Sequence, residues 1–199
     1  DAKTSGVARG MVVVAPGTGA VGDALDVELE LTRRSPELLH RAPIRCHVGT
    51  VEVRGDLLLL DRERAGAGDA FVARLELDEE LCCAPGDRFL LRLQNPPQTV
   101  GGGRVLRLSR SGRYRRQALG AELSGLLAAG DRPEARIEHE LAAAGPNGCA
   151  VDDLARALGC DERLVLDTLA TMPQAALHRR AMRAFAAEHV TAGEQELLQ

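Results

Sequence analysis

Aromatic residues and lysine are nearly absent from this chain of 199 residues. Three Phe, one Tyr and no Trp make up 2% of the sequence, and Lys3 is the sole lysine beside 24 arginines. Modules that bind RNA by stacking bases on an aromatic sheet therefore lack their main side chains. Any nucleic-acid binding by this chain must be electrostatic.

Several other signals are missing as well. No apolar run reaches the roughly 18 residues of a membrane-spanning helix, and no signal peptide opens the chain. The cysteines are odd in number and show no C-x-x-C spacing, which argues against a zinc knuckle or a redox pair and favours a reducing cytoplasm. They are Cys46, Cys82, Cys83, Cys149 and Cys160. The motifs G-x-x-x-x-G-K-[ST], H-E-x-x-H and G-x-S-x-G are absent, so no enzyme site is indicated.

The net charge of −4, from 25 basic and 29 acidic residues, excludes a bulk polycation. Only a local basic patch can attract an anionic partner. The sharpest candidate is a run of six arginines with no acid before Glu122: Arg104, Arg107, Arg110, Arg113, Arg115 and Arg116. Such a run neutralises phosphates if it meets RNA. A solvated linker in an arginine-rich sequence explains it equally well.

The first half of the chain has a period of two residues. Between Asp23 and Leu108, apolar residues alternate with polar ones, as at Leu25, Val27 and Leu29 against the polar residues that begin at Asp26. This pattern predicts strands with one apolar and one wet face, joined by Gly, Pro and Asp turns. We expect a small antiparallel barrel or sandwich, with Gly101–Gly103 at a bulge or a tight strand crossing.

The second half has a helical period. The pattern predicts a helix over residues 115–129 and a second helix with Asp131 as its N-cap. The segment 151–165 then has helix-turn-helix spacing, with Ala155 between the helices, Gly159 in the turn and Val165 in the core. Residues 175–177 and 184–185 are interpreted as a short β wing, although a helix also fits them.

Acids dominate the helical part. Residues 131–167 hold nine acids against four arginines, a net of −5, and the second helix of the motif begins with Asp161 and Glu162. Acids at this position repel a phosphate backbone. The motif is therefore interpreted as a scaffold or spacer more than as a reader of DNA.

Four motifs in the first half resemble the third domain of bacterial selenocysteine-specific elongation factors (SelB), relatives of elongation factor Tu. Arg45-Cys-His-Val-Gly-Thr50 is similar to the family's V-H-L-G-T strand, and Leu57-Leu-Leu-Leu-Asp61 follows it. Pro85–Arg92 comes next, and Asn95–Leu106 resembles S-P-x-x-T-I-G-G-G-x-V-L. Ahead of them, Ala8–Gly17 looks like the strand that closes the second domain of these factors.

The resemblance implies a mixed fold, β and then α. Residues 1–17 are expected to end a truncated second β-barrel domain, and residues 18–108 to form the Tu-type antiparallel β-barrel. Residues 109–130 are expected to be the arginine-rich linker with the first helix, and residues 131–199 a winged-helix domain. The apolar ending at Leu197-Leu198-Gln199 and the start at Asp1 indicate a fragment.

The function implied is that of a GTP-dependent translation factor that carries selenocysteyl-tRNA to the ribosome at recoded UGA codons. GTP, Mg and the catalytic GTPase site would belong to a domain before Asp1, so no cofactor is expected within residues 1–199. Further winged-helix domains would hold the mRNA hairpin that marks the codon. The resemblance implies a cytoplasmic monomer.

The resemblance also implies an RNA-contact surface. The loop Gln94-Asn95-Pro-Pro-Gln98 corresponds to the loop with which the Tu-type third domain touches the tRNA T stem. The RNA-binding candidates are Gln94, Asn95, Gln98, Arg104, Arg107, Arg110, Arg113, Arg115 and Arg116. Two alternatives stay open, namely a fragment of another translational GTPase and a DNA-binding regulator with a β-barrel sensor domain.

Overall fold

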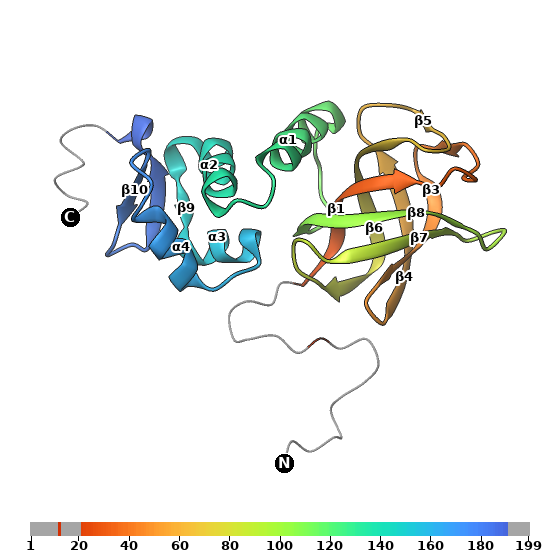
Figure 1. Cartoon of the computed structure of the whole chain (residues 1–199), viewed down its shortest axis with the longest axis horizontal. Helices are drawn as coiled ribbons and strands as arrows, with labels where there is room; N and C mark the ends of the chain where they lie inside the picture. The colour runs from red at the N-terminus through yellow and green to blue at the C-terminus, as the bar shows by residue number, and fades with distance from the viewer. Residues whose placement is uncertain (1–11, 13–20, 191–199) are drawn as a thin grey trace, which may run out of the picture. The chain divides into compact units, whose positions relative to one another are not determined.

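The computed structural model describes residue 12 and residues 21–190 (Figure 1). The predicted closing strand at residues 8–17 and the apolar ending at residues 197–199 thus lie outside the described residues, apart from Val12. The described chain divides into two compact units, with the division between Ser124 and Gly125. The predicted domain boundaries at residues 108 and 130 stay predictions.

The first unit is a closed antiparallel β-barrel with strand order β1-β6-β4-β3-β7-β8, in which β8 pairs again with β1. β2 and β5 pair with each other and form a separate two-stranded antiparallel sheet. The strands are β1 (Val21–Leu31), β2 (Leu38–Leu39), β3 (Ala42–Val48), β4 (Val51–Leu59), β5 (Arg64–Ala65), β6 (Ala70–Cys82), β7 (Arg88–Leu93) and β8 (Thr99–Ser109).

The barrel interior confirms the two-residue period. Leu25, Val27 and Leu29 of β1 are completely buried in one core cluster with Leu57 and Leu75 from the neighbouring strands. Successive side chains of a strand point to opposite faces, so each strand supplies every second residue to this core. Closure of the sheet leaves the barrel without the open edges that would pair with other chains.

The wet face predicted for β1 is wrong at one position, Asp26. Its carboxylate is fully buried on the outside of the barrel, where Arg74 of β6 and Arg107 of β8 flank it. The reason is that residues after β8 fold back over this part of the barrel and shield it from water. Alternation fixes which side of a strand a residue faces, but it does not report what covers that side.

The glycines of β8 confirm the tight strand crossing. A Cβ added at Gly103 would lie 1.8 Å from the carbonyl oxygen of Glu28 in β1, and one at Gly102 would lie 2.7 Å from that of Phe89 in β7. Only residues without a side chain permit this approach of backbones. The glycine triplet therefore has a structural role in the barrel.

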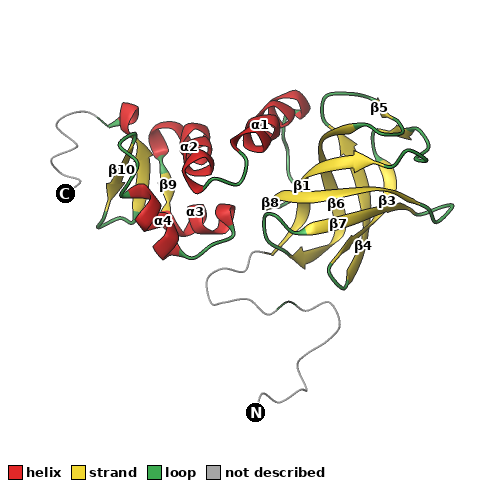
Figure 2. Ribbon diagram, in the orientation of Figure 1, coloured by secondary structure: helices red, strands yellow, loops and turns green. Residues whose placement is uncertain are grey.

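The second unit has the order of elements of a winged helix (Figure 2). The sheet order is β10-β11-β9, and the helices pack on a core that includes Ile137, Leu154 and Val165. Its elements are α2 (Pro133–Ala144), the 3-10 helix η2 (Gly145–Asn147), β9 (Cys149–Ala150), α3 (Val151–Leu158), α4 (Glu162–Leu169), β10 (Ala175–His178), β11 (Arg183–Ala186) and the 3-10 helix η3 (Ala187–His189). The preceding helix α1 (Arg116–Ala129) spans the division between the units.

The helix-turn-helix and the wing are confirmed. Ala155 of α3 and Val165 of α4 are buried, and Gly159 ends α3 in the left-handed conformation at φ 69°. β10 and β11 form the antiparallel hairpin of the wing, in register from Ala175 with Ala186 to His178 with Arg183.

The predicted cap of α2 is wrong by one residue. The N-cap is Arg132, with extended backbone at ψ 122°, and not Asp131. Pro133 explains the shift, because the ring of a proline disfavours helical backbone in the residue before it. The helix therefore starts at the proline itself, and Glu134 falls in its first turn.

No helix within the described ranges is long and apolar enough to cross a membrane.

Candidate nucleic-acid interface

The loop between β7 and β8 is a closed hairpin turn. The backbone N–H of Leu93 donates to the carbonyl of Gln98 across its base at 2.9 Å, and the Asn95–Pro96 peptide bond is cis. Asn95, Pro96 and Pro97 are exposed. The loop therefore presents a short proline-bounded tip on a fixed base.

The two glutamines of the loop hold it in place. Gln94 donates from Nε2 to the carbonyl of Ile44 in β3 at 3.1 Å, and Gln98 donates from Nε2 to the carbonyl of Arg34 at 3.0 Å. These amide donors are engaged within the barrel, so Gln94 and Gln98 position the loop. Of the three polar candidates in the loop, Asn95 is the one at the exposed tip.

A pair of arginines that the sequence reasoning missed lies next to this loop. Arg33 and Arg34 occupy the turn after β1, both side chains are exposed, and neither has an ion pair with another described residue. The bond from Gln98 to Arg34 and one from the N–H of Thr32 to the carbonyl of Val100 join the turn to the base of the loop. Two adjacent arginines directly before the turn residues Ser35-Pro36 could have indicated an exposed basic turn from the sequence. We call residues 33, 34 and 95–98 the loop–turn surface.

Most of the predicted arginine run is neutralised within the barrel unit. Four of its six members pair with carboxylates on other strands, in the loop between β4 and β5, or on the following segment. The pairs are Arg104 with Glu28 at 2.7 Å, Arg107 with Asp26 at 3.0 Å and Glu122 at 2.6 Å, Arg110 with Glu80 at 2.9 Å, and Arg116 with Glu63 at 2.8 Å. Their charges are therefore largely compensated before any partner arrives.

Arg107 pairs with two carboxylates, those of Asp26 and Glu122. Its Nε contacts Asp26, which also receives two hydrogen bonds from Arg74, at 2.7 and 2.9 Å. Burial lowers the pKa of the Arg107 guanidinium, but the carboxylates of Asp26 and Glu122 outweigh burial, and the net shift is upward. An arginine held between two carboxylates in this way is a structural clamp, because removing one partner would leave the others uncompensated.

The segment after β8 is fastened to the barrel by the same cluster. Tyr114 lies on the guanidinium of Arg74, 4.5 Å from ring centroid to Cζ, and its hydroxyl donates to Glu76. The N–H of Ser111 donates to Asp23 at 2.7 Å, a bond that lowers the pKa of this carboxyl. A Cβ added at Gly120 of α1 would meet Leu60 at 3.2 Å, so the helix lies directly against the barrel there. The arginine-rich "linker" is thus part of the barrel unit up to Ser124.

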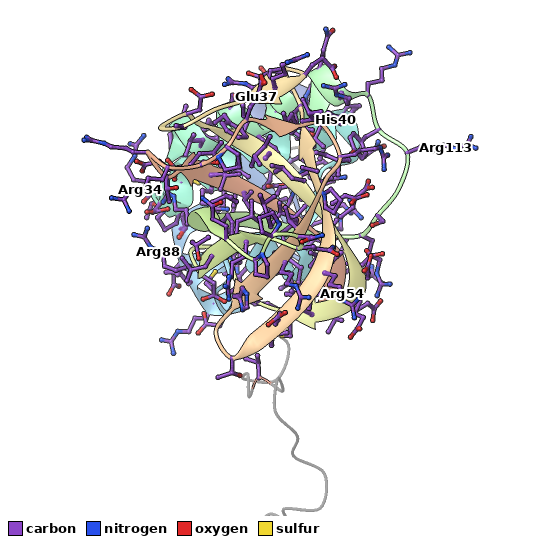
Figure 3. The ribbon with its side chains drawn as sticks, turned by 90° about the vertical axis from the view of Figure 1, so that its right-hand side faces the viewer. Arg34, Glu37, His40, Arg54, Arg88 and Arg113 are labelled. Carbon is purple, nitrogen blue, oxygen red and sulfur yellow. The ribbon has the colours of Figure 1, made fainter. Side chains whose placement is uncertain are left out.

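The remaining two members of the run, Arg113 and Arg115, are exposed and have no ion pair within the described ranges. Figure 3 shows Arg34 and Arg113 pointing away from the barrel on opposite sides. The structure therefore brings the loop together with Arg33 and Arg34 and does not bring it together with Arg113. The sequence had placed both in one RNA-contact region.

The described part of the chain contains no group of three or more His, Cys, Asp or Glu side chains able to hold a metal ion. The sequence also lacks a phosphate-binding P-loop. The five cysteines are free thiols, with the pKa of Cys46 and of Cys83 raised to about 12 by burial.

The barrel matches a known protein family. Residues 23–111 match the model of the β-barrel domain of the selenocysteine-specific elongation factor. Over 163 residues the chain is 31% identical to the selenocysteine-specific elongation factor of Desulfomicrobium baculatum. This alignment covers 81% of this chain and 25% of that protein. Over 95 residues it is 28% identical to the factor of the same name from Haemophilus influenzae, covering 48% of this chain and 15% of that protein.

A solved structure shares the fold. The crystal structure of a bacterial selenocysteine-specific elongation factor superimposes with a TM-score of 0.59 and 15% identity over 86% of this chain and 25% of that one. At this identity the likeness speaks for the fold alone. The chain spans a quarter or less of the length of the relatives it matches.

Proposed function

Because its barrel belongs to the family of selenocysteine-specific elongation factors, we propose that this chain is part of a GTP-dependent factor that delivers selenocysteyl-tRNA to the ribosome at recoded UGA codons. The family match over residues 23–111 carries this proposal. The relatives named above bear the name of that activity, and the chain corresponds to a portion of them. GTP binding and hydrolysis are assigned to other parts of the parent protein.

Within this factor the barrel contacts the tRNA through the loop–turn surface. Arg33 and Arg34 provide two exposed cations, and Asn95 provides an exposed amide beside the two prolines. An A-form stem displays phosphates and 2′-hydroxyls along a wide, shallow groove, which proteins recognise by shape and backbone contacts. A rigid loop flanked by cations suits such a stem and needs no aromatic side chain.

The arginine run divides into two roles under this proposal. Arg104, Arg107, Arg110 and Arg116 hold the barrel and the following segment together through their carboxylate partners. Arg113 and Arg115 are exposed and available for RNA. They form a second and separate contact, since Arg113 points away from the side of Arg34 (Figure 3).

The winged-helix unit follows the barrel in the same parent protein. Recognition of an mRNA hairpin is assigned to further winged-helix domains, and the ribosome is the site where both RNAs meet. We infer a monomeric, cytoplasmic factor from the family resemblance. The acidic helices α3 and α4 are consistent with a spacer role for most of this unit.

The test compares three double variants for binding of a tRNA-Sec transcript in fluorescence anisotropy across a salt series. R33A/R34A removes the loop–turn cations, R113A/R115A removes the second contact, and R54A/R88A is the control with the same charge change at two exposed positions of the barrel. We expect R33A/R34A to weaken binding about tenfold, equivalent to about 1.4 kcal/mol. Its salt slope should flatten by about 0.7 to 0.9 for each lost phosphate contact.

The smaller expectation concerns R113A/R115A, which should weaken binding by a factor of about three, or about 0.7 kcal/mol. Equal losses in R33A/R34A and in the control R54A/R88A would contradict the loop–turn surface. Tight binding of a DNA duplex that survives physiological salt would instead favour a DNA-binding regulator. In the parent factor, R33A/R34A should lower UGA recoding in a selenoprotein reporter.

A further inference from the structure

The wing of the second unit carries arginines with no acid beside them in the sequence, whereas Arg156 and Arg163 of its helices pair with acids of their own helix. β10 and β11 are joined by a turn at residues 179–182, and the sequence between Asp167 and Glu188 holds three arginines and no acid. Arg179 and Arg180 lie in the turn itself with exposed side chains. Neither has an ion pair or side-chain hydrogen bond within the described part of the chain, so two guanidinium groups stand free at the tip.

The turn that carries them is held in one shape. The backbone N–H of Ala181 donates to Nδ1 of His178 at 2.9 Å, and Met182 has a left-handed backbone at φ 47°. With Nδ1 accepting, the proton of the neutral His178 ring sits on Nε2, which is then a donor on the same turn. The N–H of Met182 donates to the carbonyl of Arg179 and closes the turn.

The base of the wing is tied to the rest of the unit. Arg183 donates from one terminal nitrogen to the carbonyls of Asn147 and Gly148, both at 2.8 Å. The N–H of Val151 donates to the carbonyl of Met182 at 2.9 Å. Arg183 is therefore a positioning residue, and Arg179 and Arg180 are displayed on a fixed support. Preorganised cations lose little freedom on binding.

The helix that usually reads nucleic acid is unsuitable here. Asp161 caps α4 by accepting from the N–H of Leu164 at 2.8 Å, and Glu162 follows it in the first turn. α3 likewise begins with Asp152 and Asp153, which pair with Arg156. Two acidic helix starts repel phosphates, whereas the sequence around the wing arginines holds no acid between Asp167 and Glu188.

We propose that the wing turn, through Arg179 and Arg180, binds the phosphate backbone of an RNA double helix. A narrow convex tip with two guanidinium groups fits between neighbouring phosphates, to which arginine donates strong charge-assisted hydrogen bonds. Contact of this kind is independent of sequence and needs no aromatic platform. The choice of RNA over DNA rests on the proposed function in translation, whereas the site itself rests on the geometry of the wing.

The experiment uses the whole 199-residue chain, labelled with ¹⁵N, and a 12-base-pair RNA duplex of arbitrary sequence as the probe. We expect the backbone amide signals of residues 178–183 to shift on titration, while those of α4 stay unmoved. R179A/R180A should weaken binding of the duplex at least threefold and reduce the slope of log affinity against log salt by about 1 to 2, as two lost phosphate contacts require. R132A/R163A is the control, because it removes the same charge from two exposed residues of the same unit.

Several results would overturn the proposal. One is a shift confined to α4, and another is an equal loss of affinity in R179A/R180A and R132A/R163A. Equal shifts of residues 178–183 with poly-glutamate of matched charge would assign the wing to an acidic protein instead. The variant R33A/R34A separates the two proposals. If it leaves tRNA affinity unchanged while R179A/R180A weakens duplex binding, the loop–turn surface fails and the wing stands, and the reverse pattern retains only the barrel site.

Discussion

The barrel unit and the winged-helix unit differ in how their arginines and acids are distributed. In the barrel unit, arginines and acids stand opposite each other on neighbouring strands and on α1, so pairs such as Arg104 with Glu28 cancel each other. In the winged-helix unit, acids collect at the starts of α3 and α4 and arginines collect in the wing. A run of like charge in the sequence is therefore a poor measure of free charge, because the partners that neutralise a strand lie far away in the chain.

The largest expected effect follows from removing the acid at the centre of the barrel cluster. Asp26→Ala leaves the buried guanidinium group of Arg74 and the half-buried one of Arg107 without their shared carboxylate. Loss of one partner from a buried pair costs about 3–5 kcal/mol of the free energy of unfolding. Urea unfolding followed by the fluorescence of Tyr114 measures it, since this sole tyrosine lies on Arg74 in the barrel unit.

The matched control is Arg110→Ala. Arg110 and Glu80 form an ion pair whose side chains are 71% and 51% exposed. Exposed pairs of this kind contribute less than about 1 kcal/mol. If the two substitutions lower the stability of the barrel by the same amount, the buried cluster does not hold the barrel and the following segment together.

The next effect tests the crowded strand. Gly103→Ala adds a methyl group 1.8 Å from the carbonyl oxygen of Glu28, so the strands must move apart. We expect a loss of about 1–3 kcal/mol, the usual cost of overpacking. Gly66→Ala is the control, because nothing lies within 4 Å of the added atom and Gly66 has no positive φ. The same urea experiment should show Gly66→Ala unchanged or slightly more stable.

Much of the fold could be predicted because it depends on local periodicity. Alternation at Leu25, Val27 and Leu29 indicated the inward face of β1, and the spacing of Ala155, Gly159 and Val165 indicated the helix-turn-helix. Both patterns reflect contacts that every strand or helix pair must make. The wing also followed from sequence, although its residues fitted a helix as well.

The charged site could be predicted less well because it depends on contacts between distant residues. Arg107 and Asp26 are 81 positions apart, and the pairing of β8 with β1 had to be known before their ion pair could be seen. Arg33 and Arg34 were overlooked for the same reason, since only the fold places them next to Gln98. The sequence shows which residues are charged, but the strand pairing determines which arginines have a carboxylate partner.

A smaller effect concerns the thiols of the two units. Burial raises the pKa of Cys46 and of Cys83 to about 12, so both remain protonated at pH 8 with about one thiolate in ten thousand. A group with a raised pKa in the folded state adds stability that is present below its ordinary pKa and is lost as the pH rises from about 9 toward 12. Alkaline pH should therefore destabilise the barrel.

Alkylation with N-ethylmaleimide at pH 8, read by peptide mass spectrometry, checks the first half of this prediction. Cys46 and Cys83 should be labelled far more slowly than in the urea-unfolded chain, while the half-buried Cys149 and Cys160 should be labelled at intermediate rates. Rapid labelling of Cys46 in the folded protein would show that the barrel core opens, and the buried cluster would then not account for its stability.

The central claim is that RNA meets the arginines that the fold leaves unpaired, and arginine footprinting tests it most directly. The chain would be modified with phenylglyoxal, alone and saturated with tRNA-Sec, and each arginine quantified by mass spectrometry. We predict that Arg104, Arg107 and Arg116 react slowly in both states, and that Arg33 and Arg34 react rapidly alone and become protected by the tRNA. Protection of the paired arginines, with Arg33 and Arg34 unchanged, would contradict the account.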